Sequence, residues 1–393
     1  MNILLAAIAF LTLEVQNPSE EYREQVVEID AATVTSKMGD SLRVLDAAGL
    51  DVPFQLTYDG KLLIGASVRA KGTARFRIVK GQAPAFPKLC QGGLHSERKD
   101  DFAWENDRGC YRVYGPALER TGERSFGIDV WTKNTPQPVV NDRYYIEDIV
   151  TIPRIDSIYR NNWAKRDSIY RTISYHYDHG EGLDPYKVGA SLGCGAPALM
   201  IGDSIVMPYC FERYEVLDEG PLRFTVRLWQ SPRVVKGDTI REQRLIQMDK
   251  GSNFCRMTVS YEGLKRPVRL CAGVVIQKED PQPVVLQPRY VSYTDPTDQP
   301  DVHQAPLYVA VLFPEGDVTT CRVPARSPKA GYDSHAVGII EDYQGEPFTY
   351  YFGSAWSKYD VRTPQEWQQR IEWFLRSVKE PLTAHLSLPQ NAK

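Results

Sequence analysis

Short stretches of alternating apolar and polar residues recur along most of the chain, and Gly, Pro or Asp follows most of them closely. A repeat of two is typical of β-strands with one buried and one solvated face, whereas an amphipathic helix repeats every 3.6 residues. Examples are LTLEVQN, EQVVEI, TARFRIVKG, LRFTVRLWQSP, TIREQRLIQMDKG, NFCRMTVSYEG and RLCAGVVIQ. The pattern predicts a mainly β protein with extensive antiparallel sheet.

A tight turn near the N-terminus supports this interpretation. Asp59-Gly60, between the strand-like LTY and KLLI, is a strong signal for a two-residue hairpin loop. We expect a β-sandwich module over residues 11–90 and a larger antiparallel β-domain over residues 91–393, which carries the catalytic groups. One continuous unit is the alternative.

The clearest helical pattern lies near the C-terminus. Thr363, Pro364 and Glu366 supply an N-cap, a proline at the first helical position and the glutamate of a capping box. The apolar residues at helical spacing along one side are Trp367, Ile371, Phe374, Leu375 and Val378. We expect a single substantial helix here, packed on the sheet, with its aromatic residues in the core.

The opening MNILLAAIAFLTL is apolar, and Ala7-Ile8-Ala9 has the small-x-small form of a signal-peptidase site. This favours a signal segment over residues 1–10 and a periplasmic or secreted protein, although the segment has no Lys or Arg. A first β-strand near the terminus is the alternative. The apolar run is shorter than the ~20 residues of a membrane-spanning helix, so we expect no membrane span.

Composition narrows the choice of partner. The 393 residues include 47 basic and 50 acidic side chains, so no net field attracts nucleic acid, and small neutral or patchily charged ligands fit better. The seven cysteines have neither C-x-x-C nor metal-knuckle spacing, which excludes zinc fingers and thioredoxin chemistry. Buried reduced thiols are as well supported as disulfides, and the sequence does not indicate an oligomeric state.

The stretch with most chemistry per residue is 173–203, ISYHYDHGEGLDPYKVGASLGCGAPALMIGD. Titratable residues alternate there with tyrosines, and frequent glycines allow tight turns. The residues concerned are His176, Asp178, His179, Glu181, Asp184, Tyr175, Tyr177 and Tyr186. This composition is typical of an active-site loop, and a solvated turn whose histidines cap carbonyl groups is the alternative.

Other segments carry groups suited to sugars, which need hydrogen-bonding partners and an aromatic face. Glu105 and Asn106 follow Trp104 at the end of one strand-like segment, where a charged surface hairpin is an equally good explanation. Two further segments pair an aromatic with a lysine, at Trp131 and Lys133 and at Trp356 and Lys358. Residues 153–171 repeat D-S-I-Y-R and are predicted to form a lid or hairpin over the site.

These residue types suit proton transfer on carbohydrates, while phosphate-loop and dinucleotide motifs are missing from the sequence. β-Elimination on a uronic acid needs a cation for the carboxylate, a base for the adjacent C–H and an acid for the leaving oxygen. The candidates are Arg112 or Lys187 as cation, His176 or His179 as base, and Tyr177 or Tyr186 as acid. A glycosidase needs two facing carboxylates, for which Glu105 and either Glu181 or Asp178 are available.

The H-Y-D-H-G-E sequence also offers ligands for a divalent cation, from His176, Asp178, His179 and Glu181. On one strand His176 and Asp178 share a face while His179 points away, so a metal site requires the loop to fold back. We therefore assign no cofactor, with a divalent cation as the alternative.

Four segments, ENDRGCYRVYGPALE, GIDVWTK, YHYDHGEGLDPYKVGASLGCG and YFGSAWSK, occur in this order. Together they resemble family 4861 of the domains of unknown function, found in secreted proteins of bacterial polysaccharide-utilisation clusters. The resemblance implies a galactose-mutarotase-like β-supersandwich and glycan processing by lyase or hydrolase chemistry. It implies no catalytic assignment.

We therefore expect a polysaccharide lyase that cleaves a uronic-acid-containing plant or algal glycan by β-elimination. A glycoside hydrolase and a non-catalytic glycan-binding protein are the alternatives. The residues expected in catalysis are His176, Tyr177, His179, Arg112, Lys187 and Glu105. Those expected to bind the polysaccharide or oligosaccharide are Trp131, Lys133, Asp178, Glu181, Tyr186, Trp356, Lys358 and Asn106. We expect the main members of this set to line one pocket.

Overall fold

The computed structural model describes residues 10–298 and 305–387. The protein is mainly β, with 45% strand and 16% helix, as the alternation of apolar and polar residues predicted. The predicted signal segment lies outside the described residues except for Phe10, which begins the first strand.

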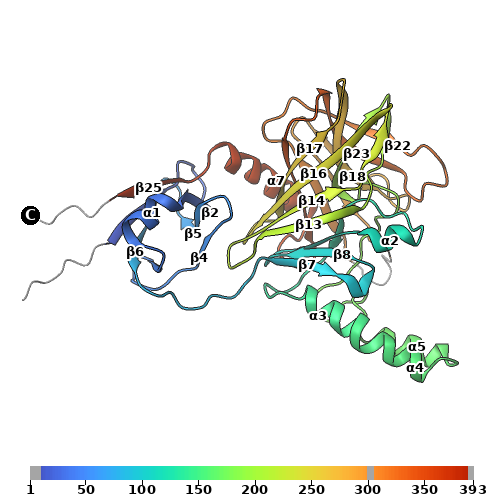
Figure 1. The fold of residues 1–393 in the computed structure, drawn as a ribbon, viewed down its shortest axis with the longest axis horizontal. Helices are drawn as coiled ribbons and strands as arrows, with labels where there is room; N and C mark the ends of the chain where they lie inside the picture. Colours follow the sequence, from blue (N-terminus) through green and yellow to red (C-terminus); the bar gives the residue numbers. More distant parts are fainter. Residues whose placement is uncertain (1–9, 299–304, 388–393) are drawn as a thin grey trace, which may run out of the picture.

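A small β-sandwich occupies one end of the molecule (Figure 1). One of its sheets has the order β25-β1-β6-β3 and the other the order β2-β5-β4, and their apolar residues form a core of their own. The strands are β1 (Phe10–Gln16), β2 (Arg23–Asp30), β3 (Leu42–Leu45), β4 (Phe54–Leu56), β5 (Lys61–Val68), β6 (Thr73–Lys80) and β25 (Thr383–Ser387), and α1 (Ala31–Met38) joins β2 to β3.

Two features of this sandwich bear on the sequence analysis. The predicted hairpin is confirmed, because Leu56 on β4 pairs with Leu62 on β5. Its loop is longer than the predicted two residues, since the Thr57 amide donates to the Lys61 oxygen and residues 58–60 form the turn between them. The strand β25, by contrast, comes from the C-terminus and pairs with β1. The predicted module 11–90 therefore lacks one of the strands that complete this sandwich.

Two antiparallel sheets form the large β-sandwich and enclose the main apolar core. The nine-stranded sheet contains β13 (Phe211–Asp218), β14 (Arg223–Gln230), β15 (Arg233–Val235), β16 (Asp238–Asp249), β17 (Phe254–Glu262), β24 (Phe348–Trp356), β21 (Leu307–Leu312), β20 (Tyr290–Asp295) and β19 (Val284–Gln287). The five-stranded sheet contains β12 (Ser204–Val206), β11 (Cys194–Ile201), β18 (Val268–Ile276), β23 (Ser334–Tyr343) and β22 (Thr319–Pro324).

A separate four-stranded sheet, of order β10-β9-β8-β7, positions most of the charged residues discussed below. Its strands are β7 (Gln91–His95), β8 (Asp101–Glu105), β9 (Cys110–Val113) and β10 (Asp129–Trp131). Because side chains alternate along a strand, Phe102 and Trp104 join the main core while Asp101 and Glu105 point to the opposite face. Asp101 and Glu105 are nevertheless fully buried, so other parts of the chain must cover this second face.

Helices supply that cover. The segment comprises α3 (Val140–Tyr144), the π-helical η2 (Tyr145–Thr151), α4 (Ile152–Ile158) and α5 (Trp163–Tyr170), and it projects from the body of the molecule (Figure 1). Val139, Val140 and Tyr144 pack against Ala103 and Trp131 of the sheet. The predicted lid or hairpin over residues 153–171 is thus mostly helical, and its two D-S-I-Y-R copies begin on α4 and α5 and extend past the ends of these helices. Two short helical stretches, η1 (Ser96–Arg98) and α2 (Pro116–Arg120), complete this region.

The predicted C-terminal helix is α7 (Pro364–Lys379), and its N-cap is confirmed, whereas the Glu366 side chain bonds the amide before the N-cap rather than that of the N-cap itself. The Thr363 hydroxyl accepts a hydrogen bond from the Glu366 amide, and the Glu366 carboxylate accepts one from the Arg362 amide. Trp367 and Ile371 pack on the outer face of the nine-stranded sheet, as the apolar spacing predicted. The expectation of a single substantial helix did not anticipate the helical segment described above.

Candidate functional site

A buried arginine organises the polar face of the four-stranded sheet. Arg112 on β9 lies directly opposite Asp129 on β10, and its Nε donates to the Asp129 carboxylate at 2.8 Å. Its Nη2 donates to Asp184 Oδ2 at 2.9 Å, and its Nη1 donates to Asp101 Oδ2 at 3.4 Å. Arg112 is only 6% exposed. One guanidinium therefore holds three carboxylates that come from distant parts of the chain.

Burial and charge oppose one another in this cluster. Burial by itself lowers the pKa of Arg112, but the combined effect of the neighbouring acidic groups, chiefly Asp129, Tyr114 and Asp184, outweighs it, so the pKa lies well above the ordinary value. Burial raises the pKa of Asp101 to about 6 even though Arg112 opposes the shift. Burial also raises the pKa of Asp129, and the adjacent Asp184 adds to the effect. The cluster thus has more carboxylates than one guanidinium readily neutralises.

His176 joins this cluster at the surface. Its Nδ1 lies 3.7 Å from Asp184 Oδ2 and 3.4 Å from the Asp184 backbone oxygen. The His176 side chain is 36% exposed, whereas that of Asp184 is 4% exposed. Among the described residues, no hydrogen bond to Nε2 of His176 is present. The imidazole is therefore held on its Nδ1 side by Asp184 and has its other nitrogen available.

The loop that carries His176 is fixed by its own backbone. Gly182 has a φ of +99°, and a Cβ atom there would lie 2.2 Å from the Thr132 backbone oxygen, so only glycine fits. The Asp178 carboxylate accepts hydrogen bonds from the amides of Gly180 and Gly182. The glycines that the sequence analysis assigned to tight turns therefore set the shape of this loop.

Several other predicted residues lie on or beside the same loop. Lys358 Nζ is 3.7 Å from Asp178 Oδ2 and 5.1 Å from the centre of the Trp356 ring. Arg171 lies over the ring of Tyr177, with its guanidinium carbon 5.6 Å from the ring centre. The structure thus brings together His176, Tyr177, Asp178, Lys358 and Arg112, together with the exposed His179 and Glu181 of the same loop.

Three predicted site residues form a closed structural unit instead. Lys133 Nζ lies 2.7 Å from Glu105 Oε2, and their side chains are 0% and 1% exposed. Glu105 also accepts hydrogen bonds from the amides of Val139 and Val140 at the start of α3. Trp131 is 1% exposed, so it presents no ring face to a ligand. These residues cannot line a wet cleft, because the sheet and α3 enclose them.

Four more predicted residues do not line a pocket with His176. Asn106 is buried and donates to two backbone oxygens of the turn after β16. Tyr186 is buried in the main core, and Trp356 is 2% exposed. Lys187 is exposed and pairs with Glu279 at 3.5 Å, away from the Arg112 cluster's aspartates. The expectation of one pocket for the whole set is therefore corrected to a smaller group around His176.

The alternative of a divalent cation gains no support from the geometry. Within residues 10–298 and 305–387, no group of three or more His, Cys, Asp or Glu side chains is placed to hold a metal ion. His176 faces Asp184, while His179 Nε2 bonds the Ser174 oxygen at 2.9 Å, so the two imidazoles have separate partners. All seven cysteines fall in the described part of the chain as free thiols.

Comparison with known proteins identifies the family. The chain matches the model of the Domain of unknown function (DUF4861) over residues 15–384. It belongs to the DUF4861 family. Uncharacterized protein P7 of Formosa agariphila is 26% identical over 333 residues, which are 82% of this chain and 76% of that protein. The predicted family is thus confirmed, whereas its galactose-mutarotase-like character stays a prediction.

Two solved structures from Enterococcus faecalis are distantly similar to this DUF4861 chain. A protein in the glycosyl hydrolase family 38 has a TM-score of 0.47 at 12% identity, covering 99% of this chain and 48% of that chain. An alpha-mannosidase of strain V583 has a TM-score of 0.46 at 11% identity, covering 98% and 46%. The DUF4861 chain thus spans about half the length of either protein. In its described residues, every helix is too short or too polar to cross a membrane.

The sequence analysis missed the carboxylates that hold Arg112. Asp129 was noted only as part of GIDVWTK, and Asp184 as part of the central loop, and neither was given a role. A signal existed in the alternation along the strands, because Asp129 and Trp131 share one face of β10. Their partnership with Arg112 depends on strand pairing, which the pattern within one strand does not reveal.

Proposed function

We propose that this DUF4861 protein is a carbohydrate-active enzyme in which His176 removes a proton from an acidic glycan. The observation that supports the proposal best is the half-exposed imidazole whose Nδ1 faces the buried Asp184. A carboxylate beside Nδ1 favours the tautomer with a proton on that nitrogen, which leaves the Nε2 lone pair for a substrate. Arg112 holds Asp184 in place through a buried ion pair.

The reaction we favour is β-elimination next to a uronic carboxylate. His176 Nε2 takes the proton from C5, the C4–O bond breaks as the C4=C5 double bond forms, and the leaving oxygen receives a proton from an acid. Tyr177 is the candidate acid, since it lies next to His176 and is partly exposed. No external oxidant or cofactor enters this step.

The cation in this scheme differs from the one predicted first. The nitrogens of Arg112 are occupied by three aspartates, so Arg112 is not free to meet a substrate carboxylate. Lys358 and Arg171 each pair with a single aspartate, Asp178 and Asp167, and keep 43% and 57% of their side chains exposed beside the loop. We assign neutralisation of the substrate carboxylate to these two residues and a positioning role to Arg112.

The substrate class and location extend the same proposal. The mixture of cations, tyrosines and acids at the loop suits a polyanionic chain rich in hydroxyl groups, such as a plant or algal uronate polysaccharide. A periplasmic or secreted enzyme would meet such a polymer, and the apolar residues 1–10 support that location.

The test is an assay on a panel of uronate polysaccharides, including polygalacturonate, alginate and glucuronan. Far-ultraviolet absorbance detects the unsaturated product of elimination, and a reducing-end assay detects any cleavage. We expect both signals to rise together. Reducing ends without absorbance would favour hydrolysis, and binding with neither signal would favour a non-catalytic glycan-binding protein.

A further inference from the structure

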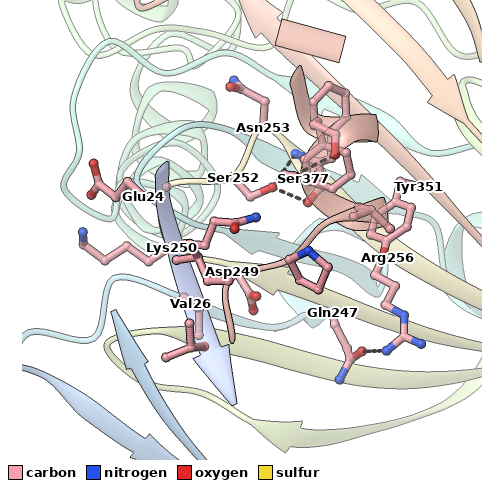
Figure 2. A pocket seen from close by; sticks show the side chains of 18 of the residues that line it. Glu24, Val26, Gln247, Asp249, Lys250, Ser252, Asn253, Arg256, Tyr351 and Ser377 are labelled. Carbon is pink, nitrogen blue, oxygen red and sulfur yellow. Dashed lines mark hydrogen bonds between the residues drawn. The ribbon is translucent and has the colours of Figure 1, made fainter. Parts of the chain in front are cut away.

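A cleft of about 420 Å³ lies away from the His176 loop, between the small sandwich, the nine-stranded sheet and α7 (Figure 2). Its walls come from β2, from the ends of β16 and β17 with the turn between them, from β24 and from α7. This volume falls within the range of ligand-binding pockets. The residues of the His176 loop do not line it.

One wall of the cleft is a row of three polar side chains in register. Gln247 on β16 pairs with Arg256 on β17, and Arg256 pairs with Tyr351 on β24. The neighbours of these residues along each strand point into the main core, so all three project from the outer face of the sheet. Arg256 Nη1 also donates to Gln247 Oε1 at 3.3 Å (Figure 2). An amide, a guanidinium and a phenol therefore stand side by side.

Charge in the cleft is only partly neutralised. Arg223 is paired with Asp249 and Glu28. Arg256, in contrast, is exposed and has no carboxylate within 4.0 Å among the described residues. From the small sandwich, Gln25 contributes a buried Oε1 with no hydrogen-bond partner in the described chain. The cleft is thus lined by a cation without a carboxylate partner in the described chain and by a glutamine whose Oε1 has no hydrogen-bond partner there.

An adjoining wall is aromatic, and its rings pack against both sandwiches. The ring of Phe374 on α7 packs edge-on against Tyr351, with ring centres 5.0 Å apart, and is tilted against Phe254, with ring centres 4.6 Å apart. Trp373, half-buried on the same helix, lies 5.8 Å from the guanidinium carbon of Arg23 in the small sandwich. These contacts join α7 to both sandwiches, so the cleft has fixed walls.

We infer that this cleft is a second glycan-binding site, which takes one or two sugar units of an acidic oligosaccharide with Arg256 on the carboxylate. Gln247 and Tyr351 then meet hydroxyl groups, and the aromatic wall meets the C–H face of the ring. This inference takes its ligand class from the proposed function. Because the cleft lacks the His176 loop, it binds substrate without cleaving it.

The test measures binding by isothermal titration calorimetry in the His176→Ala background, so that turnover does not interfere. The probes are galacturonate, mannuronate and glucuronate tetrasaccharides, with cellotetraose as the neutral control. We expect one uronate probe to bind, and Arg256→Gln to weaken that binding at least ~10-fold, since a charge-assisted contact contributes ~1.5–3 kcal/mol and 1.4 kcal/mol is tenfold. Tyr351→Phe should weaken it by a smaller factor.

The matched control is Arg241→Gln, an exposed arginine of β16 outside the cleft, which should leave binding unchanged. Equal binding by Arg256→Gln and its parent, or failure of every uronate probe to bind, would overturn the inference. The proposed function is judged separately, by turnover in the chain that retains His176. Loss of binding in Arg256→Gln alongside an inactive parent would leave the second site standing and reject the catalytic proposal.

Discussion

Asp184 Oδ2 lies 3.7 Å from Nδ1 of His176, so a buried carboxylate stands directly behind a partly exposed imidazole. The same oxygen accepts a hydrogen bond from Arg112 at 2.9 Å. The buried charged residues around Arg112 are thus connected to the protein surface through His176. This relationship distinguishes His176 from His179, which is exposed on the same loop without a carboxylate partner in the described chain.

Replacing Asp184 by Asn should reduce turnover at least ~10-fold with little change in KM, because the orientation of His176 is lost while the substrate-binding cations remain. Steady-state kinetics on the best uronate substrate would measure this. Asp156→Asn on α4, whose aspartate pairs with Arg166 at the surface, is the control and should keep full activity. Equal activity of Asp184→Asn and the parent would remove Asp184 from the mechanism.

The loop geometry predicts different outcomes for two neighbouring glycines. Gly180 and Gly182 both have positive φ, of +102° and +99°, but an added Cβ has no atom within 4 Å at Gly180 and meets the Thr132 oxygen at 2.2 Å at Gly182. Gly180→Ala should therefore cost roughly 1–2 kcal/mol of backbone strain and retain most activity. Gly182→Ala should displace the loop and abolish most activity. Parallel kinetics and melting curves test this, and equal effects of the two changes would contradict it.

Lys133 and Glu105 should behave as structural residues. Lys133→Ala leaves a buried, unpaired carboxylate, so we expect a loss of about 3–5 kcal/mol in the free energy of unfolding. Lys358→Ala, at the exposed pair with Asp178, should change it by less than ~1 kcal/mol. Urea denaturation compares the two variants. A small change in the free energy of unfolding for Lys133→Ala would contradict this structural role and would favour the predicted role of Lys133 in binding a ligand.

The buried Asp295 should make the stability of the folded protein depend on pH. Burial raises its pKa from 3.8 to about 7. Since the folded pKa exceeds the unfolded one, the folded protein binds this proton more tightly, and stability falls as the pH rises from about 4 to about 7. Asp295→Asn should remove that component, so its melting temperature relative to the parent should rise between pH 4 and pH 7. The exposed Asp203→Asn should show no such trend.

Elements of secondary structure were predicted correctly from the sequence where the signal lies in residues close together in the chain. The Thr363 N-cap of α7 and the hairpin at Asp59 and Gly60 depend on residues a few positions apart, and both are present. The helical segment over 140–170 was missed, because its apolar residues do not follow one helical face. Ile149 and Trp163, for example, are exposed. Pro153 occupies the first turn of α4, where its missing N–H is tolerated.

The candidate site was predictable in part for a similar reason. The central loop stood out because His176 and Asp184 lie in one continuous stretch with tyrosines and glycines. Glu105 and Lys133 were assigned to the site by residue type, but α3 seals them with its first amides. Whether a residue of this sheet is buried depends on which segment of the chain covers the sheet. The sequence of the strands alone does not reveal that segment.

The central claim is that His176 is the catalytic base, and its most direct test is turnover of a uronate polysaccharide by His176→Ala beside His179→Ala. We predict a loss of at least ~10²-fold in kcat for His176→Ala, with an almost unchanged melting temperature, because the side chain is partly exposed. His179→Ala should retain most of the activity. Full activity in His176→Ala would contradict the proposed mechanism.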